Sequence, residues 1–401
     1  MTSADIHVKS SHSRSGGSAT PRPHDFLLTS KQWFMVAALM LVMLSSLPSV
    51  WKAIEPLDPE MDYRVPYATS QDYWLFQRYL ETRIPEEPVF FVGDSVVWGE
   101  YVTADSTWTA FLNQHRQEGD QSFVNLALNG LYPLALEGLI THYAGPLEQS
   151  KVMLHFNLLW MSSPQADLSE PKQQVFNHPT LVPQWWPSIP SYHASFEMRL
   201  SSSIGHHWPW LAWVRHLNIQ YWDQKDPYAW TLADDGQYPP SYPHTYDFPW
   251  EVVDGKLQEA PEADPDRGMQ SSRHKAWSLD GKGTQRYPWV DLSQSLQWQA
   301  FQRLCRLMKA RRNDLLVIIG PFNKHLLVPE NRESLEQIER LACDWFESEG
   351  IPFHAPPTLE SQLYGDASHP LTAGYALLAD HLWESPLFKD WLTPPNLDAT
   401  D

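Results

Sequence analysis

Short apolar runs that alternate with helical patterns constrain the fold of this chain most strongly. Four runs have the length of buried strands, namely PVFFVG (88–93), SFVNLAL (122–128), KVMLHF (151–156) and DLLVIIG (314–320). Helical spacing of apolar residues is found at 70–83, 108–114, 134–143, 333–349 and 375–383. Strands that alternate with helices form βαβ units, whose parallel sheet is covered on both faces. We therefore predict an α/β fold, a doubly wound, flavodoxin-like three-layer sandwich.

Length and charge narrow the class of protein. The chain has 401 residues, enough for one large α/β domain with a sizeable core. Its hydrophobic fraction of 42% and charged fraction of 19% are typical of a globular protein. The formal net charge of −19 argues against nucleic acid as a partner, because phosphate binding requires a basic face.

The N-terminal region predicts a membrane segment. Residues 1–30 are rich in Ser, Gly, Pro and His, which indicates a disordered tail. The uncharged run FMVAALMLVMLSSLPSVW (34–51) is close to the lower limit of roughly 17–25 residues for crossing a bilayer. Basic residues precede the run and mainly acidic residues follow it, so the tail is expected in the cytoplasm and the remainder outside. We predict a transmembrane signal-anchor at 31–51, with a cleavable signal peptide as the alternative.

The rest of the chain divides into a linker and one large domain. Residues 52–69 are rich in Pro and acidic side chains, which indicates a linker. Residues 70–401 are expected to form the α/β domain. Within the domain, 163–288 are crowded with Trp, Pro, Tyr and His and show no clear period. This stretch is too long for a plain loop, so we predict an insertion that packs as a cap or rim. Its Trp rings either stack on sugars or pack the insertion's own small core.

The residues predict neither a metal site nor a cofactor site. Cys305 and Cys343 have no metal-ligand spacing and lie on helical patterns, which favours two buried thiols, or a disulfide if the domain is exported. His206 and His207 are adjacent and so cannot readily share one metal ion. No GxGxxG motif opens the first βα turn, so a nucleotide-dependent oxidoreductase is not expected.

Two separated motifs carry the residue types of a serine nucleophile and its base. The run FFVGDSVVWG (90–99) places Ser95 just after a predicted strand, where open α/β sheets bind ligands. Near the C-terminus, YGDASHPLTAGY (364–375) holds Asp366 and His369 three residues apart. A serine hydroxyl needs an imidazole to take its proton, and that imidazole needs a carboxylate to fix its tautomer. Taken singly, each motif is also compatible with an ordinary turn.

Four motifs in order resemble those of the SGNH/GDSL hydrolase family, namely GDS (93–95), NLALNG (125–130), HFN (155–157) and DASHP (366–370). The likeness spans about 87–160 and 313–385 and leaves the insertion uncovered. It implies the SGNH hydrolase fold, a catalytic triad and an oxyanion hole. The triad would be Ser95, Asp366 and His369, and the oxyanion donors would be Ser95, Gly130 and Asn157.

The order of elements agrees with these placements, although two positions depart from the family. Gly130 and Asn157 each follow an apolar strand, at the edge of the sheet expected for Ser95. Val96 replaces the Leu that names the GDSL group, and the neighbours of Asn157 are not the Gly and Asp usual in the family. Gly130 as a simple turn residue and Asn157 as a strand-end cap remain the alternatives.

Three functions follow as hypotheses. The first is an extracytoplasmic, periplasmic or extracellular, ester hydrolase that removes acyl groups, such as acetyl, from an envelope glycan or lipid. The second is an O-acyltransferase that passes the same acyl group from Ser95 to an exported polysaccharide. The third is a catalytically silent envelope scaffold or glycan-binding subunit. The anchor and domain together also resemble membrane-linked SGNH-like proteins of bacterial envelope polymer modification, which suggests envelope acylation machinery as a partner.

Overall fold

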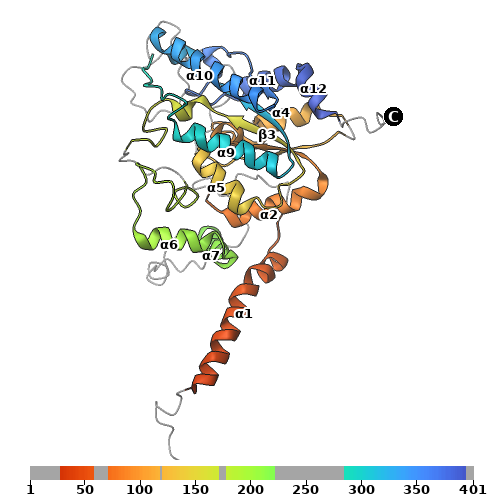
Figure 1. Cartoon of the computed structure of the whole chain (residues 1–401). Coiled ribbons are helices and arrows are strands. Elements are labelled where there is room, and N and C mark those ends of the chain that lie inside the picture. Colours follow the sequence, from red (N-terminus) through yellow and green to blue (C-terminus); the bar gives the residue numbers. More distant parts are fainter. Residues whose placement is uncertain (1–27, 58–70, 118–119, 171–177, 222–283, 394–401) are drawn as a thin grey trace, which may run out of the picture. The chain divides into compact units, whose positions relative to one another are not determined.

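The computed structural model describes residues 28–57, 71–117, 120–170, 178–221 and 284–393 of the chain (Figure 1). The chain divides into two units, Met1–Leu47 and Pro48–Asp401. The described part of the first unit is helical from Ser30 onward. The second unit contains the sheet and all the predicted site residues.

A five-stranded parallel sheet forms the centre of the second unit, in the order β2-β1-β3-β4-β5. Its strands are β1 (Val89–Val92), β2 (Phe123–Asn125), β3 (Lys151–Phe156), β4 (Asp314–Ile319) and β5 (Phe353–His354). The α/β fold and the parallel sheet predicted from the sequence are confirmed, and the first four strands fall within the four apolar runs. The fifth strand was not predicted, because it has two residues and both are only half-buried.

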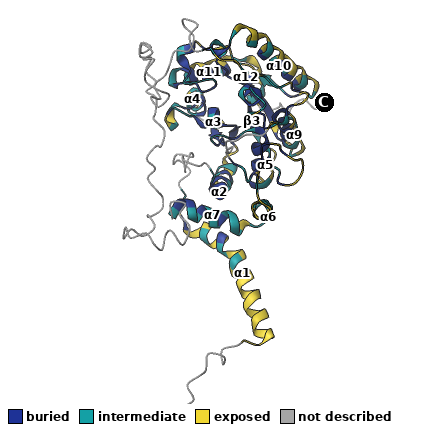
Figure 2. Ribbon diagram, turned by 90° about the vertical axis from the view of Figure 1, so that its left-hand side faces the viewer, coloured by how far each residue is buried: buried dark blue, intermediate teal, exposed yellow. Residues whose placement is uncertain are grey.

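The two faces of the sheet contribute to two separate hydrophobic clusters. Phe90 and Val92 of β1 enter the first cluster, and Val89 and Phe91 enter the second, because alternate side chains of a strand point to opposite faces. The first cluster also receives side chains from α2 (Tyr73–Arg83), α5 (Pro133–Tyr143), α9 (Leu296–Ala310) and α10 (Pro329–Ser348). The second receives them from α3 (Ser95–Trp98), α4 (Trp108–His115), α11 (Thr372–Glu384) and α12 (Pro386–Leu392). Helices therefore cover both faces, and β1 to β4 are buried apart from the first residues of β3 and β4 (Figure 2).

Part of the predicted insertion at 163–288 is helical. It contains α6 (Phe196–Gly205) and α7 (Pro209–Tyr221), while 171–177 and 222–283 lie outside the described residues. No residue of α6 is buried, so its apolar side chains do not contribute to the core. Outside the insertion, Cys305 is buried and Cys343 is half-buried, and both thiols are free.

Helix α1 (Ser30–Ile54) contains the apolar run at the N-terminus. It has 25 residues and a mean hydropathy of 1.9 over its most apolar window. At about 1.5 Å per residue it exceeds the roughly 30 Å of a bilayer core, so it is long and apolar enough to cross a membrane. A signal sequence has the same properties. The helix continues to Ile54, three residues beyond the predicted end at 51.

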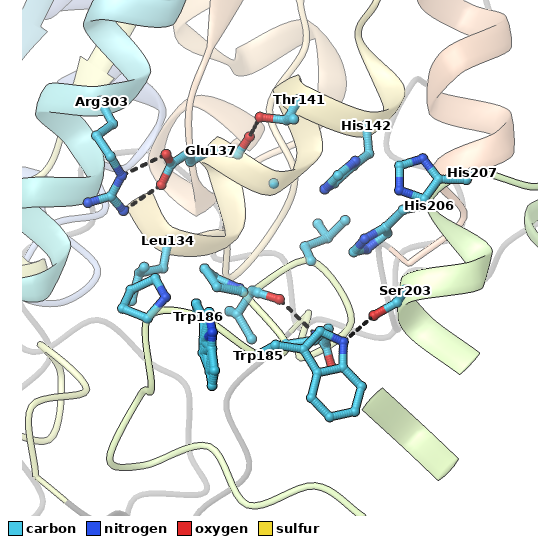
Figure 3. A pocket seen from close by; sticks show the side chains of 16 residues that line it. Leu134, Glu137, Thr141, His142, Trp185, Trp186, Ser203, His206, His207 and Arg303 are labelled. Carbon is cyan, nitrogen blue, oxygen red and sulfur yellow. Dashed lines mark hydrogen bonds and ion pairs between the residues drawn. The ribbon is translucent and has the colours of Figure 1, made fainter. Parts of the chain in front are cut away.

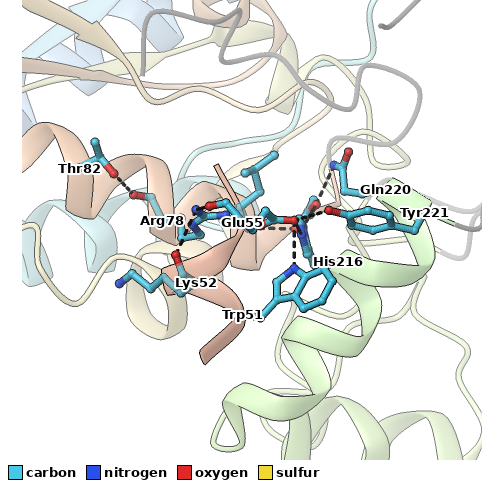
Figure 4. A network of polar contacts seen from close by, with 10 residues as sticks. Trp51, Lys52, Glu55, Arg78, Thr82, His216, Gln220 and Tyr221 are labelled. Carbon is cyan, nitrogen blue, oxygen red and sulfur yellow. Dashed lines mark hydrogen bonds and ion pairs between the residues drawn. The ribbon is translucent and has the colours of Figure 1, made fainter. Parts of the chain in front are cut away.

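A buried carboxylate lies just after α1. Glu55 is 5% exposed, and its side chain forms an ion pair with Arg78 of α2 (Figure 4). The indole N–H of Trp51 and the hydroxyl of Tyr221 also donate hydrogen bonds to it, at 3.0 and 2.9 Å. Residues from α1, α2 and α7 thus meet around one carboxylate within the second unit.

His216 of α7 lies between this carboxylate and a second one. Its Nε2 is 2.9 Å from Glu55 and its Nδ1 is 2.7 Å from Asp72, and the ring is fully buried. Burial alone would lower the pKa of His216, but the carboxylates of Asp72 and Glu55 outweigh it and raise the pKa from 6.5 to about 9. The imidazolium therefore holds the two carboxylates together at neutral pH.

We expect the folded chain to lose stability as the pH rises through about 9. A group whose pKa is raised on folding stabilises the fold fully below its unfolded pKa, here 6.5, and loses that contribution as the pH passes its folded value. The shift corresponds to roughly 3 kcal/mol at most. Denaturant unfolding of the full-length chain in detergent between pH 6 and about 10 measures this loss. His216→Gln removes the titrating group, so an equally steep decline in that variant would contradict the assignment.

A second prediction concerns the packing of the insertion on α5. A Cβ atom at Gly138 of α5 would lie 1.9 Å from the backbone oxygen of Leu181, so the helix and this segment approach too closely for a side chain. Gly138→Ala should therefore lower the free energy of unfolding by roughly 1–3 kcal/mol, despite the better helix propensity of Ala. The matched control is Gly145→Ala, whose Cβ meets nothing within 4 Å. Equal stability of the two variants would show that the helix and this segment can move apart with no loss in the free energy of unfolding.

Candidate active site

The end of β1 presents Ser95 at the carboxyl edge of the sheet. Gly93 is required there, since a Cβ atom would lie 2.8 Å from the Cβ atom of His155 on β3. Asp94 then caps α3 by accepting a hydrogen bond from the backbone N–H of Val96 at 3.0 Å. Ser95 is the first residue of α3 and is half-buried. This strand–turn–helix geometry holds the hydroxyl at the place where α/β sheets bind ligands.

Asp366 and His369 lie in a tight turn that precedes α11. The Oδ1 atom of Asp366 accepts hydrogen bonds from the backbone N–H groups of Ser368 and His369, each at 2.9 Å. The backbone N–H of Gly365 donates to the carbonyl of His369 at 2.8 Å. The turn is also tied to the segment after β4, because the N–H of Asn323 donates to the carbonyl of Ala367 at 2.8 Å.

Ser95, His369 and Asp366 form a continuous hydrogen-bonded series. The Nε2 atom of His369 is 2.7 Å from the Oγ atom of Ser95, a residue 274 positions away in the chain. Its Nδ1 atom is 2.8 and 2.7 Å from the two carboxylate oxygens of Asp366. The structure thus brings together the three residues predicted as a triad, while their catalytic role stays a prediction.

The two other predicted oxyanion donors lie near this series without contacting it. Asn157 is buried after β3; its amide donates to Asp94 at 2.8 Å, and its side-chain oxygen caps the following turn through the N–H of Leu159 at 2.9 Å. Gly130 lies after β2 with a φ of 74°. Within the described residues, no hydrogen bond joins either of them to Ser95. The local contacts of Asn157 are those of a strand-end cap, and Gly130 has the backbone conformation of a turn residue. Their oxyanion role stays a prediction.

Asp94 has more partners than the sequence indicated. Its buried carboxylate accepts hydrogen bonds from Asn157 and from the indole N–H of Trp160, the latter at 3.1 Å, and lies 3.0 Å from Nδ1 of His155. Burial raises the pKa of Asp94, but the adjacent His155 and the Asn157 amide outweigh it, so the pKa is lowered overall. Asp94 is therefore ionised beside Ser95.

Glu100 is a site residue that the sequence analysis missed. Its Oε2 atom is 3.3 Å from Nε2 of His369, the same nitrogen that faces Ser95. Gly99 ends α3 with a φ of 92°, a left-handed conformation that favours glycine, and the chain then turns back toward the site. The side chain is 15% exposed, and burial raises the pKa of Glu100. Gly99 at the helix end was the signal that could have revealed this turn.

Tyrosines border the same region and were also missed. The hydroxyl of Tyr101 donates to Asp366 at 3.3 Å, and its ring meets the His369 ring edge-on, with 5.6 Å between centroids. Burial raises the pKa values of Tyr132 and Tyr287 to about 12, and the nearby Asp366 carboxylate adds to both shifts. All three side chains are therefore neutral hydroxyls at physiological pH.

Carboxylates dominate the electrostatics of His369. Burial would lower its pKa, but the charges of Asp366 and Glu100 outweigh burial and raise the pKa from 6.5 to about 10. In turn, the imidazole lowers the pKa of Asp366 to about 2, although burial opposes this. The site therefore stabilises a proton on His369.

The described part of the chain offers no cluster of metal ligands. These residues contain no group of three or more His, Cys, Asp or Glu side chains that could hold a metal ion. His206, one of the adjacent pair noted in the sequence, stacks on His142 with 3.8 Å between ring centroids, and its Nε2 is 2.7 Å from the carbonyl of Thr180.

We expect Glu100 to raise the pKa of His369 measurably. Glu100→Gln removes one negative charge beside Nε2, so the pKa should fall from its wild-type value above neutrality. NMR titration of histidine-labelled, full-length protein measures it, with the signal assigned by its loss in His369→Asn. Glu384→Gln, an exposed carboxylate on α11, serves as the control. An identical His369 pKa in wild type and Glu100→Gln would show that Glu100 does not act on the imidazole.

Comparison with known proteins does not assign a family. A scan of the chain against protein-family models finds no match. A search against curated proteins finds no significant match either. The functional assignment therefore depends on the fold and on the geometry of the site.

Proposed function

We propose that this chain is an extracytoplasmic serine-dependent acyl-ester hydrolase of the SGNH/GDSL type. The observation that carries the proposal is the hydrogen-bonded series from Ser95 through His369 to Asp366. These distances match the reach required between a nucleophile, its base and the group that orients the base. The strand order 2-1-3-4-5, which is that of flavodoxin-like sheets, and the position of Ser95 after β1 support the fold that the family resemblance implies.

In the first half-reaction, the Oγ atom of Ser95 attacks the carbonyl carbon of the ester while Nε2 of His369 accepts its proton. The resulting tetrahedral intermediate collapses when the C–O bond to the alcohol breaks. The imidazolium of His369 protonates the departing alkoxide, which leaves an acyl group on Ser95. Asp366 stabilises the imidazolium through Nδ1 and does not itself take the proton.

In the second half-reaction, water attacks the acyl-enzyme and His369 again accepts the proton. Collapse of the second tetrahedral intermediate returns the proton to Ser95 and releases the carboxylic acid. If a sugar hydroxyl replaced the water, the same steps would transfer the acyl group instead of hydrolysing it. The two outcomes share the acyl-enzyme and are separated by their products.

The negative charge that develops on the substrate oxygen needs fixed donors. We assign this role to the backbone N–H groups of Ser95 and Gly130 and to the amide of Asn157. An amide nitrogen carries two N–H groups, and the contact with Asp94 uses one of them, so the second is assigned to the oxyanion. Donors of this kind contribute about 3–4 kcal/mol each to transition-state stabilisation.

Glu100 adjusts the base in this mechanism. Because it faces Nε2 of His369, it stabilises the imidazolium that forms when Ser95 loses its proton. The same charge reduces the fraction of neutral imidazole in the resting site, and only the neutral form can accept a proton. Glu100 therefore favours proton transfer from Ser95 once attack begins. It also means that the resting imidazole is neutral, and able to accept that proton, only at higher pH.

The substrate class follows from the expected location. Helix α1 supports export of the domain, whether it stays as an anchor or is removed as a signal sequence. An exported esterase has access to acyl esters of envelope glycans or lipids. The neutral hydroxyls of Tyr101, Tyr132 and Tyr287 suit a polar, uncharged substrate of this kind.

We expect the full-length chain in detergent to hydrolyse a chromogenic acetyl ester. Ser95→Ala and His369→Ala should each reduce kcat/KM by on the order of a thousandfold or more, because each removes an essential group of one unit. The matched controls are Ser348→Ala and His381→Ala, both at exposed helix positions, which should retain the wild-type rate. Equal rates in all five proteins would exclude the triad.

The fate of the acyl group is measured in the same assay. With an oligosaccharide added, free acetate should remain the main product. Predominant formation of acetylated oligosaccharide, dependent on Ser95, would replace the hydrolase with an O-acyltransferase.

A further inference from the structure

Helix α6 and two preceding tryptophans present an apolar face to solvent. Phe196, Leu200 and Ile204 are four residues apart and therefore lie on one side of α6, with exposed fractions of 65%, 42% and 43%. Trp185 and Trp186 are 44% and 79% exposed. We call these five side chains the apolar face. Contiguous exposed apolar surface of this kind marks an interaction site more often than a single exposed residue does.

The apolar face is held in place by specific contacts. The indole N–H of Trp185 donates to the hydroxyl of Ser203 on α6 at 2.8 Å, and its ring packs edge-on against Phe196, with 5.7 Å between centroids. Figure 3 shows Trp185, Trp186 and Ser203 at a cavity of about 600 Å³ between α5, α6 and residues 181–187. The segment and the helix therefore present one continuous surface.

The basic side chain of α6 is tied to the preceding segment, while its one acidic side chain, Glu197, is exposed. Arg199 is the only Lys or Arg of the helix. Its guanidinium donates to the backbone oxygens of Gln184 and Tyr192, the latter at 3.0 Å, so it is tied to the preceding segment. The five side chains of the apolar face are themselves uncharged, which favours an occupant bound through apolar contact.

The apolar face is also connected to the end of the membrane segment. Trp51 ends the apolar run at 34–51, and its ring contacts Trp213 and Tyr221 of α7, with centroid distances of 6.1 and 5.7 Å. Figure 4 shows Trp51 and Tyr221. Helix α7 follows α6 after three residues, and the N–H of Trp208 donates to the carbonyl of Ile204 at 3.0 Å. Trp51 therefore contacts α7, the helix that directly follows α6 and its part of the apolar face.

We propose that the apolar face inserts into the headgroup boundary of the bilayer that α1 crosses. The inference rests on the proposed membrane anchoring and adds a second point of attachment. Tryptophan is enriched at this boundary because its ring is apolar while its N–H is polar. Leu200 and Ile204 favour lipid over a glycan as the occupant, because branched aliphatic side chains offer no flat ring for a sugar.

The test uses the full-length chain reconstituted in phosphatidylcholine liposomes. Single cysteines are introduced by Leu200→Cys, Leu377→Cys and Val42→Cys in a Cys343→Ser background that keeps the buried Cys305, and each is spin-labelled. Leu377 on α11 is the matched control, since it is 41% exposed against 42% for Leu200 and lies at the opposite end of the domain from α6 (Figures 1 and 2). A cooperative denaturant transition like that of the wild type shows that each labelled protein is folded.

Collision of the labels with oxygen, which concentrates in lipid, is compared with collision with a water-soluble nickel chelate. The proposal predicts that the ratio of oxygen to nickel collision at position 200 is several-fold above the ratio at 377. Like the ratio at 42, it should indicate a lipid environment. A lipid environment at 42 together with an aqueous environment at 200 would overturn the proposal for the apolar face but leave the membrane anchoring intact. Shielding of 200 from both reagents would indicate a protein partner or second copy and would also overturn it. An aqueous signal at 42 would overturn the anchoring and this inference together, leaving the esterase proposal to its own assay.

Discussion

The buried carboxylate of Asp94 is the interaction on which the candidate site depends. It orients the first turn of α3 through the N–H of Val96, and it ties the end of β3 to the end of β1 through Asn157 and Trp160. A buried carboxylate without such donors would cost several kcal/mol. The requirement to satisfy Asp94 therefore fixes the backbone on which Ser95 stands, and hydrogen bonding at this point determines the geometry of the site.

The sequence predicted the centre of this structure because the relevant signals are local. Four strands appear as apolar runs, since both faces of the sheet are covered, and the Asp-x-x-His turn is specified by Asp366 itself, which binds the backbone of the residues it precedes. Strand β5 could not be predicted, because two half-buried residues give no pattern. Helix α6 was not predicted, although Phe196, Leu200 and Ile204 recur at helical spacing, because this period covers only ten residues within a stretch crowded with Trp and Pro.

The part of the site that the sequence did not predict depends on long-range contact. Glu100 meets His369 only because Gly99 adopts a left-handed conformation and turns the chain back, and no local pattern encodes the partner. Asn157 was identified from the HFN motif (155–157), but its bond to Asp94 requires knowledge of which strands are neighbours. Sequence reasoning thus identified the residue types of the site and left their electrostatic surroundings open.

Acceptors face both nitrogens of the His369 ring. Asp366 binds Nδ1, and Glu100 and Ser95 lie at Nε2, so an imidazolium finds an anionic partner on each side. A neutral imidazole has a single N–H and leaves one of these carboxylates without a proton donor. Glu100 and the Ser95 hydroxyl therefore face the same nitrogen, and its protonation state decides which of them it can bind.

The position of Glu55 limits where a protease can separate the domain from its apolar segment. The carboxylate lies one residue beyond α1, yet its partners Arg78 and His216 belong to α2 and α7. Cleavage after Glu55 would leave two buried cationic groups without this partner, a loss of roughly 3–5 kcal/mol for a broken buried pair. Cleavage before Trp51 would keep every partner. A released form of the domain should therefore begin upstream of Trp51 and carry a short remnant of the helix.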